Sequence, residues 1–277
     1  MIVEGHEKRR RFGRVMPLRV LIPNAVTALA LCFGLTGIRF AVGGEWEKAV
    51  TAIIIAGILD ATDGRIARLL KGQSRFGAEL DSLSDVIAFG VSPAIIIYLW
   101  SLQHFERLGW IFALAHAVCC ALRLARFNAN LDVDDQPHKS AGFFTGIPSP
   151  AGAGVALAPV YLWLVTGLDV FRSPAVTAPV LAATAFLMIS NLPTYSWKSI
   201  RLPKGWRLTA LAGVALFGGA LLVEPWVTLS AVTIAYLVAI PFSLNSYRRI
   251  RRQAAVAGPA PEAPIELDEH ERAGPAE

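Results

Sequence analysis

Four aspartates interrupt an apolar stretch in the first third of the chain. Asp60 and Asp63 end one apolar run, and Asp81 and Asp85 begin the next. A carboxylate inside a lipid bilayer is costly, so it usually has a function there. If both runs are helices, spacings of three and four residues put each pair on one helix face. Two such helices joined by a short turn would direct all four carboxylates to one point. Their mutual repulsion then requires a cation, and oxygen ligands suit Mg²⁺ or Mn²⁺.

The residues between the aspartates indicate what such a cation would help to hold. Gly64 and Ala67 leave one face of the first helix without large side chains, so a bulky ligand could approach its backbone. Arg68 follows one turn after Gly64 and could bind a phosphate in a bidentate way. Gly77 clears space at the start of the next helix. This combination favours a nucleotide diphosphate held by divalent cations.

The same aspartates have simpler explanations. An intramembrane aspartate could serve a proton or cation pathway, or it could lie at a helix end that faces water. A cation transporter is therefore an alternative. Transporters, however, usually show paired broken helices in two inverted halves, and the acidic motif occurs once in this chain.

The spacing of these residues resembles the signature of the CDP-alcohol phosphotransferase family, which reads D-x2-D-G-x2-A-R-x8-G-x3-D-x3-D. The chain meets every fixed position of that signature, with Asp60, Asp63, Gly64, Ala67, Arg68, Gly77, Asp81 and Asp85. The resemblance implies the family's fold and chemistry over roughly residues 15–250. It implies that the four aspartates bind one or two divalent ions, and that Asp85 is the general base that takes the proton of the acceptor hydroxyl.

The resemblance also implies a binding site for CDP and its phosphates. Family members tend to have Asn at the position of Asn24, although a helix cap would explain this residue as well. Thr27 would face the same direction one turn later. Ser74 lies in the connecting loop, where it could touch phosphate or be a solvated turn residue. The expected set is Asn24, Thr27, Asp63, Gly64, Ala67, Arg68, Ser74 and Gly77.

A second run, ALRLARFN, places basic and aromatic residues at the end of an apolar segment. Arg123 and Phe127 are spaced to share one helix face and could bind a small zwitterion, with the arginine taking its carboxylate. Anchoring by positive charge would explain the arginines too. The run resembles the phosphatidylserine synthase branch of the family. That resemblance implies serine binding by Arg123 and Phe127, supported by Arg126 and Asn128, and phosphatidyl transfer from CDP-diacylglycerol to L-serine with release of CMP.

Sister enzymes with another acceptor remain an alternative, namely glycerol phosphate, inositol phosphate or choline. Acceptors that carry their own phosphate usually need an additional basic cluster, which the chain does not clearly offer. The loop at residues 136–150, with Phe143 and Phe144, resembles a segment of the synthase branch. It could cover the active site or be a surface turn, and its role stays open.

The composition indicates an all-α integral membrane protein. Of 277 residues, 54% are hydrophobic and 17% are charged, whereas a soluble domain normally has about a quarter charged residues. A membrane-spanning helix needs about 20 mostly apolar residues. About eight segments qualify, at 22–42, 48–70, 79–102, 108–127, 149–168, 174–192, 206–223 and 226–247.

The basic residues predict how these helices are oriented. All but four of the 26 Lys and Arg residues fall at one set of helix ends, and the exceptions are Arg39, Lys48, Arg107 and Arg172. The positive-inside rule then places both termini and the carboxylates in the cytoplasm. It also explains the net charge of +5 without nucleic acid, through attraction to anionic membrane lipids.

The chain is expected to form one membrane domain at residues 21–250, between a basic cytoplasmic segment at 1–20 and a disordered cytoplasmic tail at 251–277. The basic segment could lie on the membrane surface as an interfacial helix. The family resemblance implies the plasma (inner) membrane and a homodimer. His116 lies in the middle of an expected span, where a hydrogen-bonded structural role is more usual than catalysis.

Overall fold

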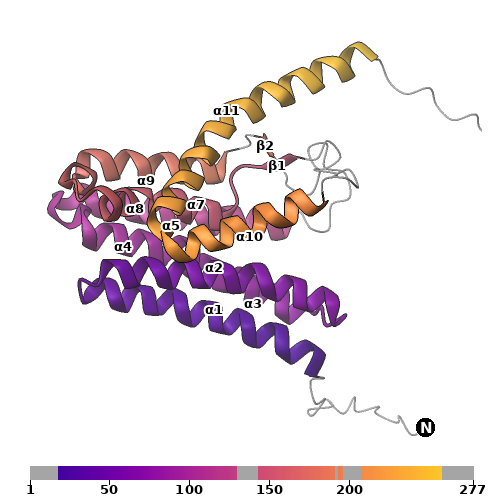
Figure 1. Ribbon diagram of the computed structural model, residues 1–277, viewed down its shortest axis with the longest axis horizontal. Coiled ribbons are helices and arrows are strands. Elements are labelled where there is room, and N and C mark those ends of the chain that lie inside the picture. Colours follow the sequence, from indigo (N-terminus) through magenta and orange to yellow (C-terminus); the bar gives the residue numbers. More distant parts are fainter. Residues whose placement is uncertain (1–17, 130–142, 191–192, 196–206, 258–277) are drawn as a thin grey trace, which may run out of the picture.

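The computed structural model describes residues 18–129, 143–190, 193–195 and 207–257. Figure 1 shows a bundle of helices in which α1 and α2 form one side, while α7, α8 and α9 lie on the other. The α-helices are α1 (Leu18–Val42), α2 (Trp46–Leu69), α3 (Arg75–Asp85), α4 (Ser92–Trp100), α5 (Glu106–Ala129), α7 (Ser149–Ala156), α8 (Ala158–Thr166), α9 (Pro174–Ile189), α10 (Arg207–Val223) and α11 (Pro225–Ala257). Three short helical turns join them, η1 (Val86–Val91), η2 (Leu102–His104) and η3 (Asp169–Arg172).

All eight segments that were expected to cross a membrane coincide with helices. Five helical stretches are long and apolar enough to do so in the described part of the chain: Leu18–Val42, Arg75–Trp100, Arg107–Ala129, Ser149–Thr166 and Pro225–Phe242. The helices Pro174–Ile189 and Leu208–Val223 are apolar but shorter. The expectation of a helical membrane protein is therefore confirmed.

One short sheet departs from the all-α expectation. Strands β1 (Phe143–Thr145) and β2 (Pro193–Tyr195) pair antiparallel, with Phe144 opposite Thr194. The sheet joins the chain before α7 to the chain after α9. Residues 136–142 of the loop expected at 136–150 precede β1 and lie outside the described residues.

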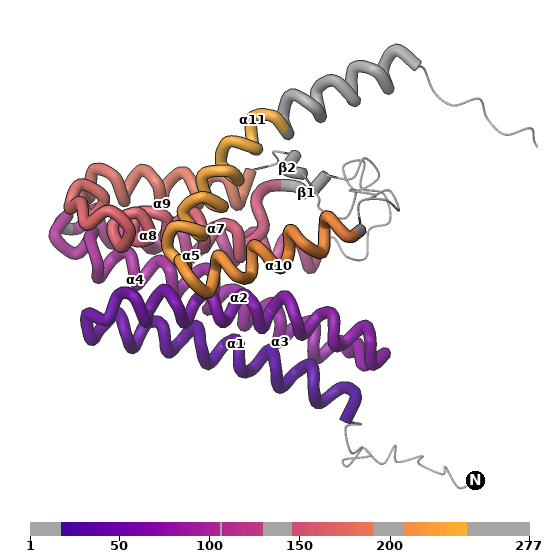
Figure 2. The backbone as a smooth tube through the Cα atoms, in the orientation of Figure 1, coloured from indigo at the N-terminus to yellow at the C-terminus, as the bar shows by residue number. Residues whose placement is uncertain are grey.

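Close packing of α1 against its neighbours fixes the first half of the fold. A methyl group added at Gly34 would lie 2.9 Å from the backbone of Ala88, and one added at Gly37 would lie 3.0 Å from Ile53. These two glycines therefore let α1 approach η1 and α2 at backbone distance. The tube in Figure 2 shows α1 and α2 running side by side along their length.

A wide turn interrupts the helix that begins with α3. Residues Val86–Val91 form a π-helical segment between α3 and α4, and Pro93 follows at the start of α4. Because proline has no N–H, it cannot donate to the carbonyl of Phe89 four residues earlier. That carbonyl instead accepts a hydrogen bond from Nε2 of the buried His116, at 3.3 Å. Nδ1 of His116 bonds with the hydroxyl of Thr184, at 3.2 Å. These contacts fit the structural role expected for His116.

The main core lies at the end of the bundle away from the four aspartates. It contains fully buried side chains from α4, η2, α8 and α9, among them Trp100, Leu102, Val160 and Leu181.

The last two helices are more loosely attached, and Figure 1 shows α11 projecting beyond the bundle. Helix α11 continues to Ala257, past residue 250 where the membrane domain was expected to end. The expected segment at 1–20 is described only from Leu18, and the rest of the tail lies outside the described residues.

Candidate functional site: a carboxylate cluster

The turn between α2 and α3 is short because local hydrogen bonds close both of its ends. At the end of α2, the N–H of Gly72 donates to Ala67 and that of Lys71 to Arg68, and Lys71 adopts a left-handed conformation with φ 49°. This pattern is the Schellman motif. At the start of α3, the hydroxyl of Ser74 accepts a hydrogen bond from the N–H of Gly77, at 3.0 Å. Ser74, expected to contact phosphate, therefore caps α3.

The carboxylates of Asp60, Asp63 and Asp81 converge across this turn. Each offers one oxygen atom, and the three atoms lie within 4.8 Å of one another. Asp63 is buried at 4% exposure, while Asp60 and Asp81 are half-buried. The site therefore lies at the edge of the bundle, within reach of a ligand from outside.

Asp85 lies next to this trio through its contact with Asp60, whose carboxyl group it meets at hydrogen-bonding distance. Two carboxylates in contact repel each other unless a proton or a cation lies between them. The cluster offers only oxygen ligands, in a number and spacing that a hard divalent cation such as Mg²⁺ or Mn²⁺ accepts. The four aspartates therefore fit a divalent metal site.

Helix α1 orients the cluster from the side. The hydroxyl of Thr27 lies 2.5 Å from Oδ2 of Asp63 and donates to it, and the backbone carbonyl of Thr27 accepts from the hydroxyl of Ser84 at 3.2 Å. Thr27 was expected to bind the nucleotide. Its observed contacts connect α1 to both helices that bear the aspartates.

Asn24 is not a helix cap, because α1 begins at Leu18 and continues through Pro23. The cap interpretation is therefore wrong. Its side chain is buried at 9% exposure, and its amide nitrogen has no hydrogen-bond partner in the described part of the chain. A methyl group at Gly77 would lie 2.7 Å from the amide oxygen of Asn24. The absence of a side chain at Gly77 thus lets the start of α3 pack closely against Asn24.

Pro23 also explains how the turn after α2 meets α1. The missing N–H of Pro23 cannot bond to the carbonyl of Arg19 four residues earlier. A methyl group added at Gly72 would lie 1.9 Å from this same carbonyl oxygen, so Gly72 packs directly against it.

The surface of α2 beside the cluster is open, as the sequence indicated. Nothing lies within 4 Å of a methyl group built at Gly64, and both Gly64 and Arg68 are exposed. Ala67 is half-buried. A ligand can therefore approach the backbone of α2 beside Arg68 and the aspartates.

The structure separates the four residues that were expected to bind the acceptor. Arg123 lies close enough to Asp85 for the two charges to attract each other, and its Nη1 donates to the hydroxyl of Ser149 at 3.0 Å. The side chain of Asn128 donates to Ser82, at 2.9 Å. Arg126 and Phe127 are exposed, and Nη1 of Arg126 donates to the carbonyl of Ile189 at 3.3 Å.

Sequence analysis did not identify two residues beside Arg123, namely Ser149 and Tyr236. Ser149 lies between the prolines of the segment IPSPAG, which is the one signal that could have found it. Tyr236 lies in the distant apolar helix α11, and no pattern marks it. Its hydroxyl group and Nε of Arg123 are both buried without a hydrogen-bond partner in the described residues. Both groups can donate a hydrogen bond to a ligand with acceptor atoms, such as a carboxylate.

Comparison with known proteins agrees with this arrangement. The family model described as CDP-alcohol phosphatidyltransferase matches residues 20–241. A CDP-diacylglycerol–serine O-phosphatidyltransferase of Mycobacterium leprae is 37% identical over 240 residues, which cover 87% of this chain and 79% of the relative. A protein of the same name from Helicobacter pylori is 33% identical over 218 residues, covering 79% and 88%. The archaetidylserine synthase of Methanothermobacter thermautotrophicus is 32% identical over 178 residues, covering 62% and 69%.

The matched region contains every element that bears the four aspartates, together with Arg123, Ser149 and Tyr236. Several of its helices are long and apolar enough to cross a membrane. The chain is a multi-pass membrane protein that belongs to the CDP-alcohol phosphatidyltransferase family.

Proposed function

We propose that this protein transfers the phosphatidyl group of CDP-diacylglycerol to the hydroxyl of L-serine and releases CMP. The observation that carries this proposal is the convergence of the aspartates beside Arg123. The names of the relatives support serine as the acceptor. Two of them are named for CDP-diacylglycerol and serine, and the third, an archaetidylserine synthase, is also named for a serine product.

The aspartates would hold the two divalent ions that the reaction needs, and Mg²⁺ or Mn²⁺ suits their oxygen atoms. Asp60, Asp63 and Asp81 would be the main ligands, with Asp85 at the edge. When bound, such ions neutralise negative charge on the diphosphate and on the departing CMP. Thr27 keeps Asp63 in place for this role through its hydrogen bond.

The nucleotide end of the lipid would lie along the open face of α2. Gly64 and Ala67 leave room for it there, and Arg68 supplies a guanidinium group for phosphate. On the side of α3, Gly77 packs against Asn24, whose unpaired amide nitrogen can donate to a phosphate or ribose oxygen.

The acceptor would bind between Asp85 and Arg123. The guanidinium group of Arg123 and the hydroxyl of Tyr236 would bind the carboxylate of serine, while Asn128 and Phe127 lie further along α5. The serine oxygen forms a bond to the phosphatidyl phosphorus, and the bond from that phosphorus to the CMP oxygen breaks. Asp85 accepts the proton of the serine hydroxyl, which contributes about 10²–10⁴-fold to the rate.

The surrounding topology is part of the proposal. Eight crossings, with both termini and the carboxylates on the cytoplasmic side of the plasma membrane, would bring the lipid and the water-soluble acceptor to one boundary. A membrane domain at residues 21–250 would contain all of the proposed site residues. Exposed apolar side chains on α10 and α11, such as Leu211 and Val238, would face lipid or a second protomer.

One assay tests the reaction. Purified protein is incubated with CDP-diacylglycerol, Mg²⁺ or Mn²⁺, and one of serine, glycerol phosphate, inositol phosphate or choline, and the release of CMP is measured. We expect release with serine alone, and none once a chelator removes the metal. Release with another acceptor instead would reassign the substrate. A protein that conducts cations and releases no CMP would be a transporter.

A further inference from the structure

A cavity of about 410 Å³ lies at the end of the bundle opposite the aspartates. It forms where α4 ends, where η3 runs and where α9 begins. Trp46, the first residue of α2, lies against an arginine of this cavity, Arg172. Asp60 of the carboxylate cluster is roughly 21 Å further along α2, at 1.5 Å of rise per residue. The cavity is therefore separate from the site described above.

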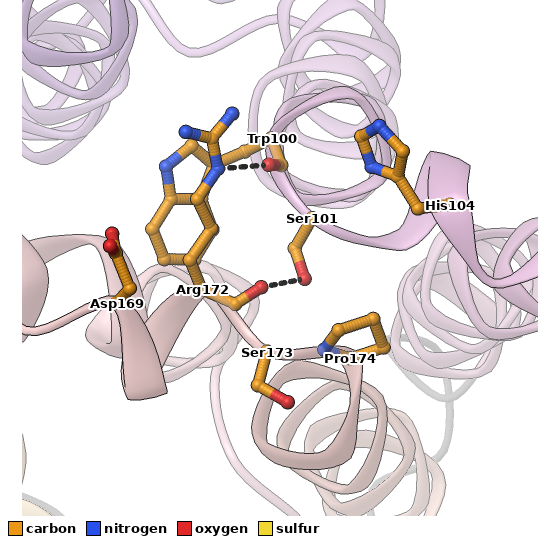
Figure 3. Close-up of a pocket in the computed structure, with 7 residues that line it drawn as sticks. All are labelled: Trp100, Ser101, His104, Asp169, Arg172, Ser173 and Pro174. Carbon is orange, nitrogen blue, oxygen red and sulfur yellow. Dashed lines mark hydrogen bonds between the residues drawn. The ribbon is translucent and has the colours of Figure 1, made fainter.

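Contacts on two sides hold Arg172 in the cavity wall. Its Nε donates to the carbonyl of Trp100 at 2.9 Å (Figure 3). Its guanidinium carbon lies 5.9 Å from the centre of the Trp46 ring. The backbone carbonyl of Arg172 accepts from the hydroxyl of Ser101, at 2.6 Å. No salt bridge to Arg172 is found among the described residues. Its two terminal nitrogens are thus presented as a fixed fork, the geometry that binds phosphate.

Two further features of the cavity favour an anion beside Arg172. Trp100 is fully buried, yet its indole N–H has no hydrogen-bond partner in the part of the chain that is described. An unpaired buried donor costs about 1–3 kcal/mol, which a ligand acceptor would recover. Ser173 and Pro174, at the start of the long helix α9, also line the cavity. The positive end of the helix dipole therefore adds to the attraction for negative charge.

The cavity also has a carboxylate that Arg172 does not neutralise. Asp169 is exposed, and its Oδ1 accepts from the indole N–H of Trp163 at 3.3 Å. Figure 3 shows Asp169 at one side of the cavity and His104 at the opposite side. A ligand that complements both Arg172 and Asp169 must carry a negative and a positive group.

The position of the cavity indicates where such a ligand comes from. Five of the seven tryptophans of the chain lie at this end of the helices: Trp46, Trp100, Trp110, Trp163 and Trp226. Tryptophan is enriched at the boundary between a membrane and water. The cavity therefore lies at the level of lipid headgroups, in the leaflet opposite the carboxylate cluster.

We propose that this cavity binds the headgroup of a zwitterionic phospholipid, with its phosphate at Arg172 and Trp100 and its ammonium group at Asp169. The site is independent of the proposed transfer reaction. It would select phosphoethanolamine headgroups over phosphoglycerol headgroups, because only the former carry an ammonium group for Asp169.

Lipid binding to the purified full-length protein tests the proposal by native mass spectrometry. The intact chain in detergent is titrated with phosphatidylethanolamine and with phosphatidylglycerol. For the unchanged protein we expect tighter binding of phosphatidylethanolamine. Arg172→Gln should weaken both lipids by about tenfold or more, the usual effect of losing a charge-assisted hydrogen bond. Asp169→Asn should weaken phosphatidylethanolamine alone and bring the two lipids to similar affinity.

Arg107→Gln is the matched control, because Arg107 is an exposed arginine at the same end of the molecule that does not line the cavity. It should leave both affinities unchanged. Release of CMP should be the same in all three variants, so a failure of this proposal is distinct from a failure of the proposed reaction. If Arg172→Gln does not fold, the Asp169→Asn variant alone tests the proposal, because Asp169 is exposed and its substitution should not disturb folding.

Two results would overturn the proposal. The first is equal binding of the two lipids to the unchanged protein and to Asp169→Asn. The second is displacement of the lipid by an equal concentration of soluble phosphoethanolamine, because the cavity would then be a site for a free metabolite. Failure of soluble phosphoethanolamine and of inorganic phosphate to compete would support the lipid.

Discussion

Asp85 lies between two different partners, the carboxyl group of Asp60 and the guanidinium group of Arg123. The other two aspartates of the cluster face each other and Asp60. This position lets Asp85 reach a hydroxyl group on an acceptor that Arg123 holds. The proposed role of Asp85 is therefore to accept a proton, and the proposed role of the other three aspartates is to bind the divalent ions.

Asp85→Asn should therefore abolish turnover while leaving CDP-diacylglycerol bound. The amide keeps the size of the side chain and cannot take a proton at neutral pH, so CMP release should fall by at least about 10²-fold. Binding of the lipid substrate is measured separately by equilibrium titration. Asp169→Asn, at the opposite end of the molecule, is the control with the same chemical change. Substantial residual turnover in Asp85→Asn would remove it as the base.

Tyr236→Phe should raise the KM for serine by about tenfold or more with little change in kcat. The change removes one hydroxyl group, whose hydrogen bond to a charged carboxylate contributes about 1.5–3 kcal/mol. Arg123→Ala should raise the same KM further, and neither variant should alter the KM for CDP-diacylglycerol as strongly. Tyr98→Phe serves as the control, because Tyr98 packs against Trp110 away from the cluster. An unchanged KM for serine in both test variants would exclude this acceptor site.

At the scale of the elements, glycines determine how closely the aspartate-bearing helices approach α1. Gly72 packs on the carbonyl of Arg19, whereas Gly64 faces open space. The same substitution should therefore have opposite consequences at the two positions.

Gly72→Ala should lower the unfolding temperature by several degrees, because a methyl group 1.9 Å from a backbone oxygen forces the turn away from α1. Gly64→Ala should instead raise the unfolding temperature slightly, because alanine is the better helix former. It should also weaken CDP-diacylglycerol binding, since its methyl group projects where the ligand approaches. Gly154→Ala, where a methyl group also meets nothing within 4 Å, is the control for both measurements. Equal unfolding temperatures for the variants at 72 and 64 would contradict this account.

The sequence predicted the helices and the meeting of the aspartates because both follow from spacing. Apolar runs of sufficient length form helices in a membrane, and aspartates three or four residues apart share a helix face. The sequence could not predict Tyr236 beside Arg123, because that contact depends on how α11 packs against α5. Of the two interpretations of Asn24, only the helix cap fails, because Pro23 often begins a helix while here α1 begins earlier. The π-helical turn after Asp85 likewise depends on His116, which bonds to the carbonyl that Pro93 leaves free.

At the scale of the whole molecule, the two ends of the bundle differ in chemistry. One end has the carboxylates, with Arg68, Lys71 and Arg75 nearby, and the other has the tryptophans and few basic residues. The proposed orientation places the first end in the cytoplasm.

Single cysteines introduced at Lys48 and Lys71 test this orientation in intact cells. Both side chains are exposed, and they lie at opposite ends of α2. A membrane-impermeant maleimide should label Lys48→Cys in intact cells and label Lys71→Cys only after the membrane is opened. The native cysteines are first replaced by Ala, and the protein without cysteines is the background control. The reverse pattern of labelling would invert the orientation.

Thr27 has a consequence for how the protein could adapt to its ligands. Through its hydroxyl it bonds to α2, and through its carbonyl it bonds to α3, although α1 contributes no aspartate. Any sliding of α1 along its axis would therefore pull on both acidic pairs together and change the gap between them. A helix that contributes no aspartate would in this way couple the positions of the two acidic pairs.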